Sequence, residues 1–297
     1  MSGFRSRLQA NAHRIEEALS AFLPRDKQGF DRLLWESMGY STLGGGKRLR
    51  GHLVLEFCSL WGGNPRHALH YAAGLEMIQA FSLIHDDLPC MDNDTLRRGK
   101  PTNHVVYGDA TALLAGDALA LYAPSVLAAN PHCTPAQNLQ AVQILAEKSG
   151  AMGLCGGQQI DLQSENKEIG REELEELVAK KCGALFEAAC ALGCIAAGGD
   201  ETAVERSKEF GLCVGIAFQI ADDLLDLHAD ASVLGKTPGK DEQSGKSTFC
   251  ALLGEEGAKA YMLSLVAKAK ELLYTFPSTE ARASLEEFCD FIVDRSY

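Results

Sequence analysis

The stretch FSLIHDDLPCMD, at residues 81–92, places Asp86 and Asp87 directly after an apolar run of helical length, with Asp92 five residues later. A second cluster, ADDLLD at residues 221–226, follows another apolar run in the other half of the chain. Apolar residues recur at spacings of three and four along most of the sequence, whereas alternating strand patterns are scarce. The sequence therefore predicts an all-α protein in which two helical stretches lead into acidic clusters.

The first cluster needs a break in its helix. Asp86 and Asp92 are six residues apart, and an unbroken helix of about 100° per residue would point them about 120° from each other. Pro89 removes an amide donor and disfavours helical geometry at Leu88. We therefore predict that the chain bulges after Asp86 and re-aims Asp92 toward the same site.

The second cluster suits a regular helix. Asp222 and Asp226 are four residues apart, so a helix stacks their carboxylates on one face and turns Asp223 aside. Mg²⁺ takes oxygen ligands and bridges carboxylates to substrate phosphates, so two such clusters predict paired Mg²⁺ sites for a diphosphate. An acidic run can also be a solvated helix face or a cap, but two matched clusters favour the metal sites.

The composition favours a single globular domain and argues against a nucleic-acid-binding protein. The chain has 297 residues, 46% of them hydrophobic, and a net charge of −12, which argues against general nucleic-acid binding. Glycine and proline breaks separate segments of helical length, and no long Pro/Ser-rich linker appears. We expect one domain over residues 1–297, a helical bundle of about ten or more helices.

The sequence predicts neither export nor a disulfide framework. Residues 1–23 are amphipathic rather than of signal-peptide type, and the most apolar segment, Ala184 to Ala197, is too short to span a bilayer and contains Glu187. The ten cysteines form no Cys-x-x-Cys pair and lie mostly in apolar helical contexts, as buried, reduced thiols do. We expect a cytoplasmic protein without stable membrane insertion.

Basic residues accompany the acidic clusters, as counter-charges for diphosphate should. Arg97 and Arg98 follow the first cluster, and Lys236, Lys240 and Lys246 follow the second. A third basic group, GKRLR at residues 46–50, follows two further glycines but lacks the frame of a nucleotide P-loop.

Taken in order, these motifs resemble the short-chain trans-isoprenyl diphosphate synthases. The resemblance rests on GGKRLR at 45–50, the first cluster with RRG at 97–99, GGQ at 156–158, FQ at 218–219 and the second cluster, and it covers almost the whole chain. It implies an all-helical fold around a deep central cavity, usually in a homodimer, with the two acidic clusters facing each other across the cavity mouth.

The resemblance also implies roles for individual residues. Mg²⁺ ions that clamp the allylic diphosphate would be held by Asp86, Asp92 and Asp222, with Asp87 and Asp226 as close supports. Positive charge around that diphosphate would come from Arg97, Lys181, Lys236 and Lys246. Isopentenyl diphosphate would be bound by Gly46, Lys47, Arg50, Gln79 and Arg98. Gln219 and the backbone near Lys181 would lie beside the allylic cation.

Two positions depart from the family pattern. Gln79 stands where many relatives carry histidine, and it donates a hydrogen bond but carries no charge. Cys182 stands where the family often has threonine, so a hydroxyl is missing beside the cation. His85 precedes the first acid pair, but a histidine beside an aspartate is as often an orienting partner as a base, so we leave it outside the catalytic set.

The implied chemistry is ionisation of the allylic diphosphate, alkylation of isopentenyl diphosphate and proton loss, with the released diphosphate as base. Phe81 and Ser82 would face the growing chain, and an aromatic at residue 81 favours farnesyl diphosphate. Residues 88–104 look instead like plastid-type geranylgeranyl synthases, which keeps that product open. A terpene cyclase would normally mix Asn, Ser and Glu in its second metal motif, and a non-catalytic subunit of a synthase heteromer would have lost these carboxylates or cations.

Overall fold

The computed structural model describes residues 3–24, 27–165, 167–228 and 247–294. In chain order the elements are α1 (Gly3–Phe22), α2 (Arg32–Thr42), α3 (Leu49–Leu60), the 3₁₀ turn η1 (Pro65–Ala68), α4 (Leu69–Asp86), β1 (Leu96–Arg97), β2 (Lys100–Pro101), α5 (Asn103–Tyr107), α6 (Asp109–Ala128), α7 (Pro135–Ser149), α8 (Leu154–Ser164), α9 (Arg171–Val178), the π-helical turn η2 (Ala179–Gly183), α10 (Ala184–Ala196), α11 (Glu201–His228), α13 (Phe249–Tyr274) and α14 (Glu280–Asp294). Within these ranges the only strands form one short hairpin, so the predicted all-α fold of about ten or more helices is confirmed.

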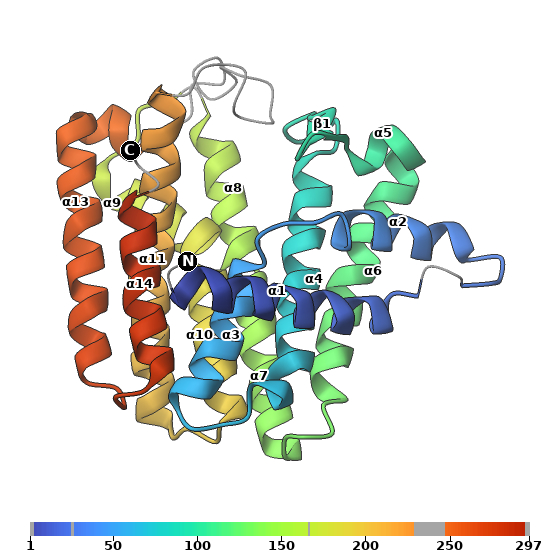
Figure 1. Cartoon of the computed structure of the whole chain (residues 1–297). Coiled ribbons are helices and arrows are strands. Elements are labelled where there is room, and N and C mark those ends of the chain that lie inside the picture. The colour runs from blue at the N-terminus through green and yellow to red at the C-terminus, as the bar shows by residue number, and fades with distance from the viewer. Residues whose placement is uncertain (1–2, 25–26, 166, 229–246, 295–297) are drawn as a thin grey trace.

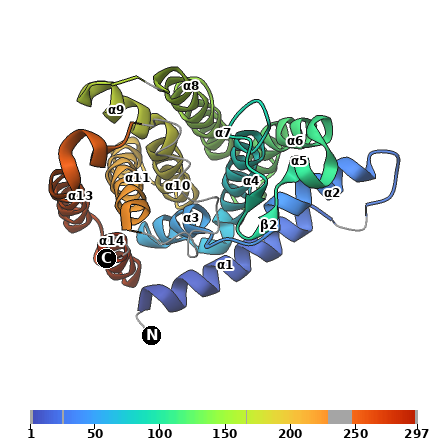
Figure 2. The same ribbon diagram turned by 90° about the horizontal axis from the view of Figure 1, so that it is seen from above.

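The helices surround α10, the most apolar segment of the sequence. A helix that is hydrophobic on all sides must be covered on all sides, and α10 is covered by α3, α4, α7 and α11. Helix α6 then packs on the outer side of α4, and α13 packs on α11, as the end-on view in Figure 2 shows. The helices that carry the two acidic clusters therefore flank the same central helix.

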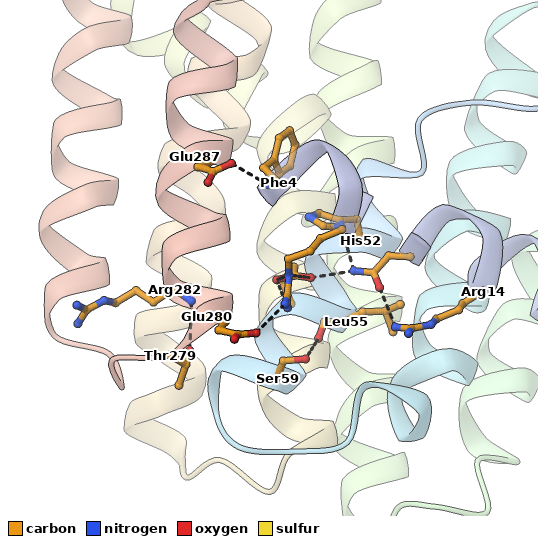
Figure 3. Close-up of polar contacts among 12 residues, drawn as sticks. Phe4, Arg14, His52, Leu55, Ser59, Thr279, Glu280, Arg282 and Glu287 are labelled. Carbon is orange, nitrogen blue, oxygen red and sulfur yellow. Dashed lines mark hydrogen bonds and ion pairs between the residues drawn. The ribbon is translucent and has the colours of Figure 1, made fainter. Parts of the chain in front are cut away.

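The N-terminal helix α1 lies across these upright helices, against α3, α4 and α14 (Figure 1). A buried polar cluster fastens it to α3. The Arg7 guanidinium donates to both oxygens of the buried Glu56 at 2.8–3.2 Å, and the Asn11 amide donates to Glu56 at 2.8 Å and lies 3.0 Å from Nδ1 of His52. The ring of Phe4 meets His52 edge-on (Figure 3).

His52 makes this attachment sensitive to acid. Burial, and to a smaller degree Arg7, lowers the pKa of His52 from 6.5 to about 3. The folded protein therefore holds the imidazole neutral, and its contribution to stability is complete above pH 6.5 and is lost as the pH falls from 6.5 toward 3. Between pH 7 and pH 5 the loss should be about 2 kcal/mol of unfolding free energy.

The measurement is urea unfolding of wild type and His52→Gln at both pH values. Wild type should lose about 2 kcal/mol more than His52→Gln on going to pH 5. Glu56, whose pKa burial raises, acts in the opposite direction but is present in both proteins. His13→Gln, which changes an exposed histidine of α1, should keep the wild-type pH dependence. An equal loss in wild type and His52→Gln would contradict the assignment.

Candidate active site

Helix α4 stops at Asp86, as the proline argument predicts. The chain then turns back on itself, and the amide of Asp92 donates to the carbonyl of Asp86 at 2.8 Å. Asp92 is thus folded back beside Asp86 instead of continuing around the helix. On the other wall, α11 runs without interruption through residues 222–226, so Asp222 and Asp226 share a helix face.

The two clusters meet around one short turn. Lys181 is a charged neighbour of Asp86, and the next residue, Cys182, has Asp222 and Asp223 among its charged neighbours. Both residues belong to η2, the π-helical turn between α9 and α10. Segments separated by more than 130 residues in the sequence are thereby brought to a single site.

The electrostatics of Asp86 suit a cation. The pKa of this carboxyl is raised from 3.8 to about 6, mainly by burial and to a smaller degree by Asp92 and Asp87, against the lowering effect of Lys181 and Arg97. Carboxylates crowded together out of water favour a bound divalent ion. Within the described ranges no three acidic, histidine or cysteine side chains converge closely enough to hold a metal alone.

Asp87 has a different place from Asp86. It is buried, and its two oxygens accept three hydrogen bonds of 2.6–2.9 Å from the guanidinium of Arg97. Burial alone would lower the pKa of Arg97, but the bonds and charge of Asp87 raise it overall. The structure thus uses Asp87 to anchor Arg97 beside Asp86.

Lys181 is anchored in the same way by a residue that the sequence analysis missed. Its ammonium donates to the Asp161 carboxylate of α8, at 2.5 Å. Helix α8 approaches so closely because residue 157 is glycine: a Cβ there would lie 2.2 Å from the backbone nitrogen of Lys181. Asp161 follows Gly157 by one helical turn, so the GGQ motif carries the signal that could have identified it.

Arg48, just before α3, and Arg50, in its first turn, have different surroundings. Arg48 turns inward, where it donates to Glu76, Glu16 and the carbonyl of Thr42. Arg50 instead stacks over the ring of Phe186 at 4.7 Å, and its buried Nε has no hydrogen-bond partner. Both terminal nitrogens of Arg48 are therefore bonded within the protein, although its Nε is unpartnered too, whereas Arg50 has more donor capacity left for an anion.

Arg98 and Gly46 lie beside that anion site. The Arg98 guanidinium donates to the carbonyl of Gly45. A Cβ on Gly46 would come within 2.8 Å of this guanidinium. Gly46 also has a φ of +131°, so a side chain is disfavoured there on both counts. Burial lowers the pKa of Arg50, as does Arg98, while Glu76, Cys182 and Asp222 raise it. The exposed Lys47 lies over the ring of Phe291, 5.6 Å from its centroid.

The residues below Asp86 on α4 point in two directions. Ser82 is buried, one turn from Asp86, and Gln79 is half-buried a further turn down the same side. The Phe81 ring lies edge-on to His85 at 4.9 Å, and His85 Nε2 lies 3.0 Å from the Leu113 carbonyl of α6. Phe81 and Ser82 are thus neighbours on different faces of α4, and His85 packs against α6.

Of the remaining predicted residues, Gln219 contacts Cys182 and Asp223 within the site. Lys236, Lys240 and Lys246 lie outside the described residues.

Comparison with known proteins agrees with this architecture. A family model described as Polyprenyl synthetase matches residues 31–272. A curated chloroplastic geranylgeranyl pyrophosphate synthase from Capsicum annuum is 44% identical, over 89% of this chain and 72% of its own length. The crystal structure of an FPP/GFPP synthase from Zymomonas mobilis superposes with a TM-score of 0.88 at 37% identity, covering 98% of this chain and 99% of that one. A Helicobacter pylori geranyltransferase, solved with magnesium and isoprenyl diphosphate, matches at 31% identity and a TM-score of 0.82, over 99% and 97% of the two chains.

Proposed function

This chain belongs to the polyprenyl synthetase family, and we propose on that premise that it is a Mg²⁺-dependent, homodimeric prenyltransferase of the cytoplasm. Its substrates are dimethylallyl or geranyl diphosphate and isopentenyl diphosphate. The observation that carries the proposal is the meeting of both acidic clusters at Lys181 and Cys182, with the unpaired Nε of Arg50 behind them. A non-catalytic subunit would have no use for this complete set of carboxylates and cations.

The proposed reaction uses two diphosphate sites, one for the allylic substrate and one for isopentenyl diphosphate. Mg²⁺ held by Asp86, Asp92 and Asp222, with Asp226 in support, would stabilise the charge that develops on the departing diphosphate. Lys181 and Arg97 add fixed positive charge there, and their own anchors prevent them from moving away as the bond breaks.

Isopentenyl diphosphate is bound on the other side of the site. Arg50 and Arg98 offer guanidinium forks, and Lys47 adds a charge at the exposed rim. The allylic cation forms between the two sites, near Gln219, which presents an amide dipole but no nucleophile that could trap it. The departing diphosphate then accepts the proton that is lost.

For the product we propose farnesyl diphosphate, because Phe81 places an aromatic ring beside the α4 segment that leads down from Asp86. Geranylgeranyl diphosphate is the second candidate, since the name of the Capsicum annuum relative supports it. Chromatography of products made from each allylic starter with isopentenyl diphosphate separates the two. We expect C15 product that disappears with EDTA. A C20 product would support geranylgeranyl diphosphate as the product instead. The absence of any product would support the non-catalytic subunit.

The homodimer is proposed from an exposed apolar face on α5 and α6. Val105, Val106, Leu113, Leu114 and Leu121 are each 46–78% exposed, while the rest of α6 packs on α2, α4, α5 and α7. By length and composition α6 would also suffice to cross a membrane, a property that the core helices of soluble proteins share. Leu121→Glu should convert the protein to a monomer in light scattering, whereas Leu263→Glu, on the distant α13, should not. A wild-type protein that is monomeric in light scattering would contradict the proposed homodimer.

Gln79 offers a test of the isopentenyl diphosphate site. Histidine at this position adds a charge-capable donor, so Gln79→His should lower the KM for isopentenyl diphosphate about threefold at pH 6 and less at pH 8, where imidazole is neutral. Gln79→Ala should raise this KM, and neither change should alter the KM for the allylic starter. An unchanged KM for isopentenyl diphosphate in both variants would place Gln79 outside the site.

A further inference from the structure

The π-helical turn η2 lets two successive residues reach opposite walls of the site. Lys181 bonds to Asp161 of α8, and Cys182 bonds to Gln219 of α11. Short π-helical insertions widen a helix and are frequent at functional sites. The mechanism above gives Lys181 a role but leaves the thiol of Cys182 without one.

Glycine contacts bring this turn against α11. A Cβ on Gly215 would lie only 2.8 Å from the Cα of Gly183, so the two backbones touch. Gln219 follows Gly215 by one helical turn and is on the same face of α11. The backbone contact therefore brings the side chains of Cys182 and Gln219 together.

The side chains form a directed chain of hydrogen bonds. Cys182 Sγ donates to Gln219 Oε1 at 3.0 Å, and Gln219 Nε2 donates to Asp223 Oδ1 at 2.8 Å. The opposite orientation of the amide would set its oxygen against the Asp223 carboxylate and its NH₂ against sulfur, a weak acceptor. Burial raises the pKa of Cys182 to about 12, although Lys181 and Arg50 lower it. The thiol thus keeps its proton and remains a donor.

We propose that Cys182 is a positioning residue that fixes the amide of Gln219, with its oxygen toward η2 and its nitrogen on Asp223. This role of Cys182, the residue that stands in place of threonine, rests on the function proposed above. The fixed amide occupies one oxygen of the Asp223 carboxylate, so that Asp222 and Asp226 are left as the proposed metal ligands of α11. It also keeps a negative dipole end beside the forming allylic cation.

The test is a double-mutant cycle on steady-state prenyl transfer. Cys182→Val fills the space of the thiol without a donor, and it should lower kcat about tenfold with both KM values within about twofold. Cys182→Ser restores a donor and should return kcat to within about threefold of wild type. In a Gln219→Ala background, Cys182→Val should cost less than about twofold, because the group through which it acts is gone. Cys190→Ala, which removes a buried thiol of α10, should leave kcat unchanged.

Three results would overturn the inference: wild-type kcat in Cys182→Val, equal loss in Cys182→Val and Cys182→Ser, or the same loss from Cys182→Val in both backgrounds. Thermal unfolding of each variant checks that the fold is retained, and Cys182→Ala replaces Cys182→Val if valine lowers the melting temperature. Failure of the proposed function is a separate outcome, since wild type itself would then show no prenyl transfer.

Discussion

Exchanging Asp222 for asparagine is expected to lower kcat by about a thousandfold, because the proposed Mg²⁺ would depend on this carboxylate and a Lewis-acidic ion supplies several kcal/mol of transition-state stabilisation. Asparagine keeps the shape of the side chain but lacks its charge. The loss should appear at saturating concentrations of both substrates and Mg²⁺. The measurement is product formation over a Mg²⁺ titration, in which the remaining activity should need more Mg²⁺ than wild type.

The matched control is Asp117→Asn on α6. The Asp117 side chain is 53% exposed and lies 3.7 Å from His85. It should keep wild-type kcat. Because Asp86 and Asp222 would serve the same group, Asp86→Asn combined with Asp222→Asn should cost far less than the product of the two single losses. A loss of under tenfold in Asp222→Asn would contradict the two-cluster site.

Removing the ring of Phe81 is expected to lengthen the main product from C15 to C20 or beyond. Phe81→Ala deletes a large aromatic side chain, and the space that it leaves beside α4 would admit a further isoprene unit. Total turnover should change much less than product length, because Asp86 and the diphosphate sites are untouched. Chromatography of the products after equal substrate conversion provides the measurement.

Ser82→Phe tests the other face of α4. Ser82 is buried on the side of Asp86, whereas Phe81 leans toward His85 and α6. If the growing chain runs past Phe81, Ser82→Phe should alter chain length less than Phe81→Ala does. A product set that is unchanged in Phe81→Ala and shortened in Ser82→Phe would make Ser82 the residue that limits growth.

Much of the fold was predictable because its signals are local. Spacings of three and four in apolar residues identify helices, and the position of Pro89 correctly predicts that α4 ends before Asp92. The regular pairing of Asp222 and Asp226 on α11 follows from helical periodicity alone. The family resemblance is confirmed by the match to residues 31–272.

The partners of the charged residues were not predictable in this way. Asp87 was expected as a metal support, and the structure pairs it with Arg97. Asp161 received no role, yet it anchors Lys181. Both pairings depend on how close two segments come in space, and carboxylates have no periodic signature that distinguishes an ion ligand from an arginine anchor.

By itself, the sequence determined the helices, the two acidic clusters and the geometry of each cluster, since all of these follow from spacing along a single segment. Tertiary structure alone decided that the π-helical turn joins the clusters and that Cys182 reaches Gln219. The physical reason is backbone contact: Gly157 lets α8 approach this turn, and Gly183 and Gly215 let α11 approach it. Those contacts join residues far apart in the chain, so no local pattern records them.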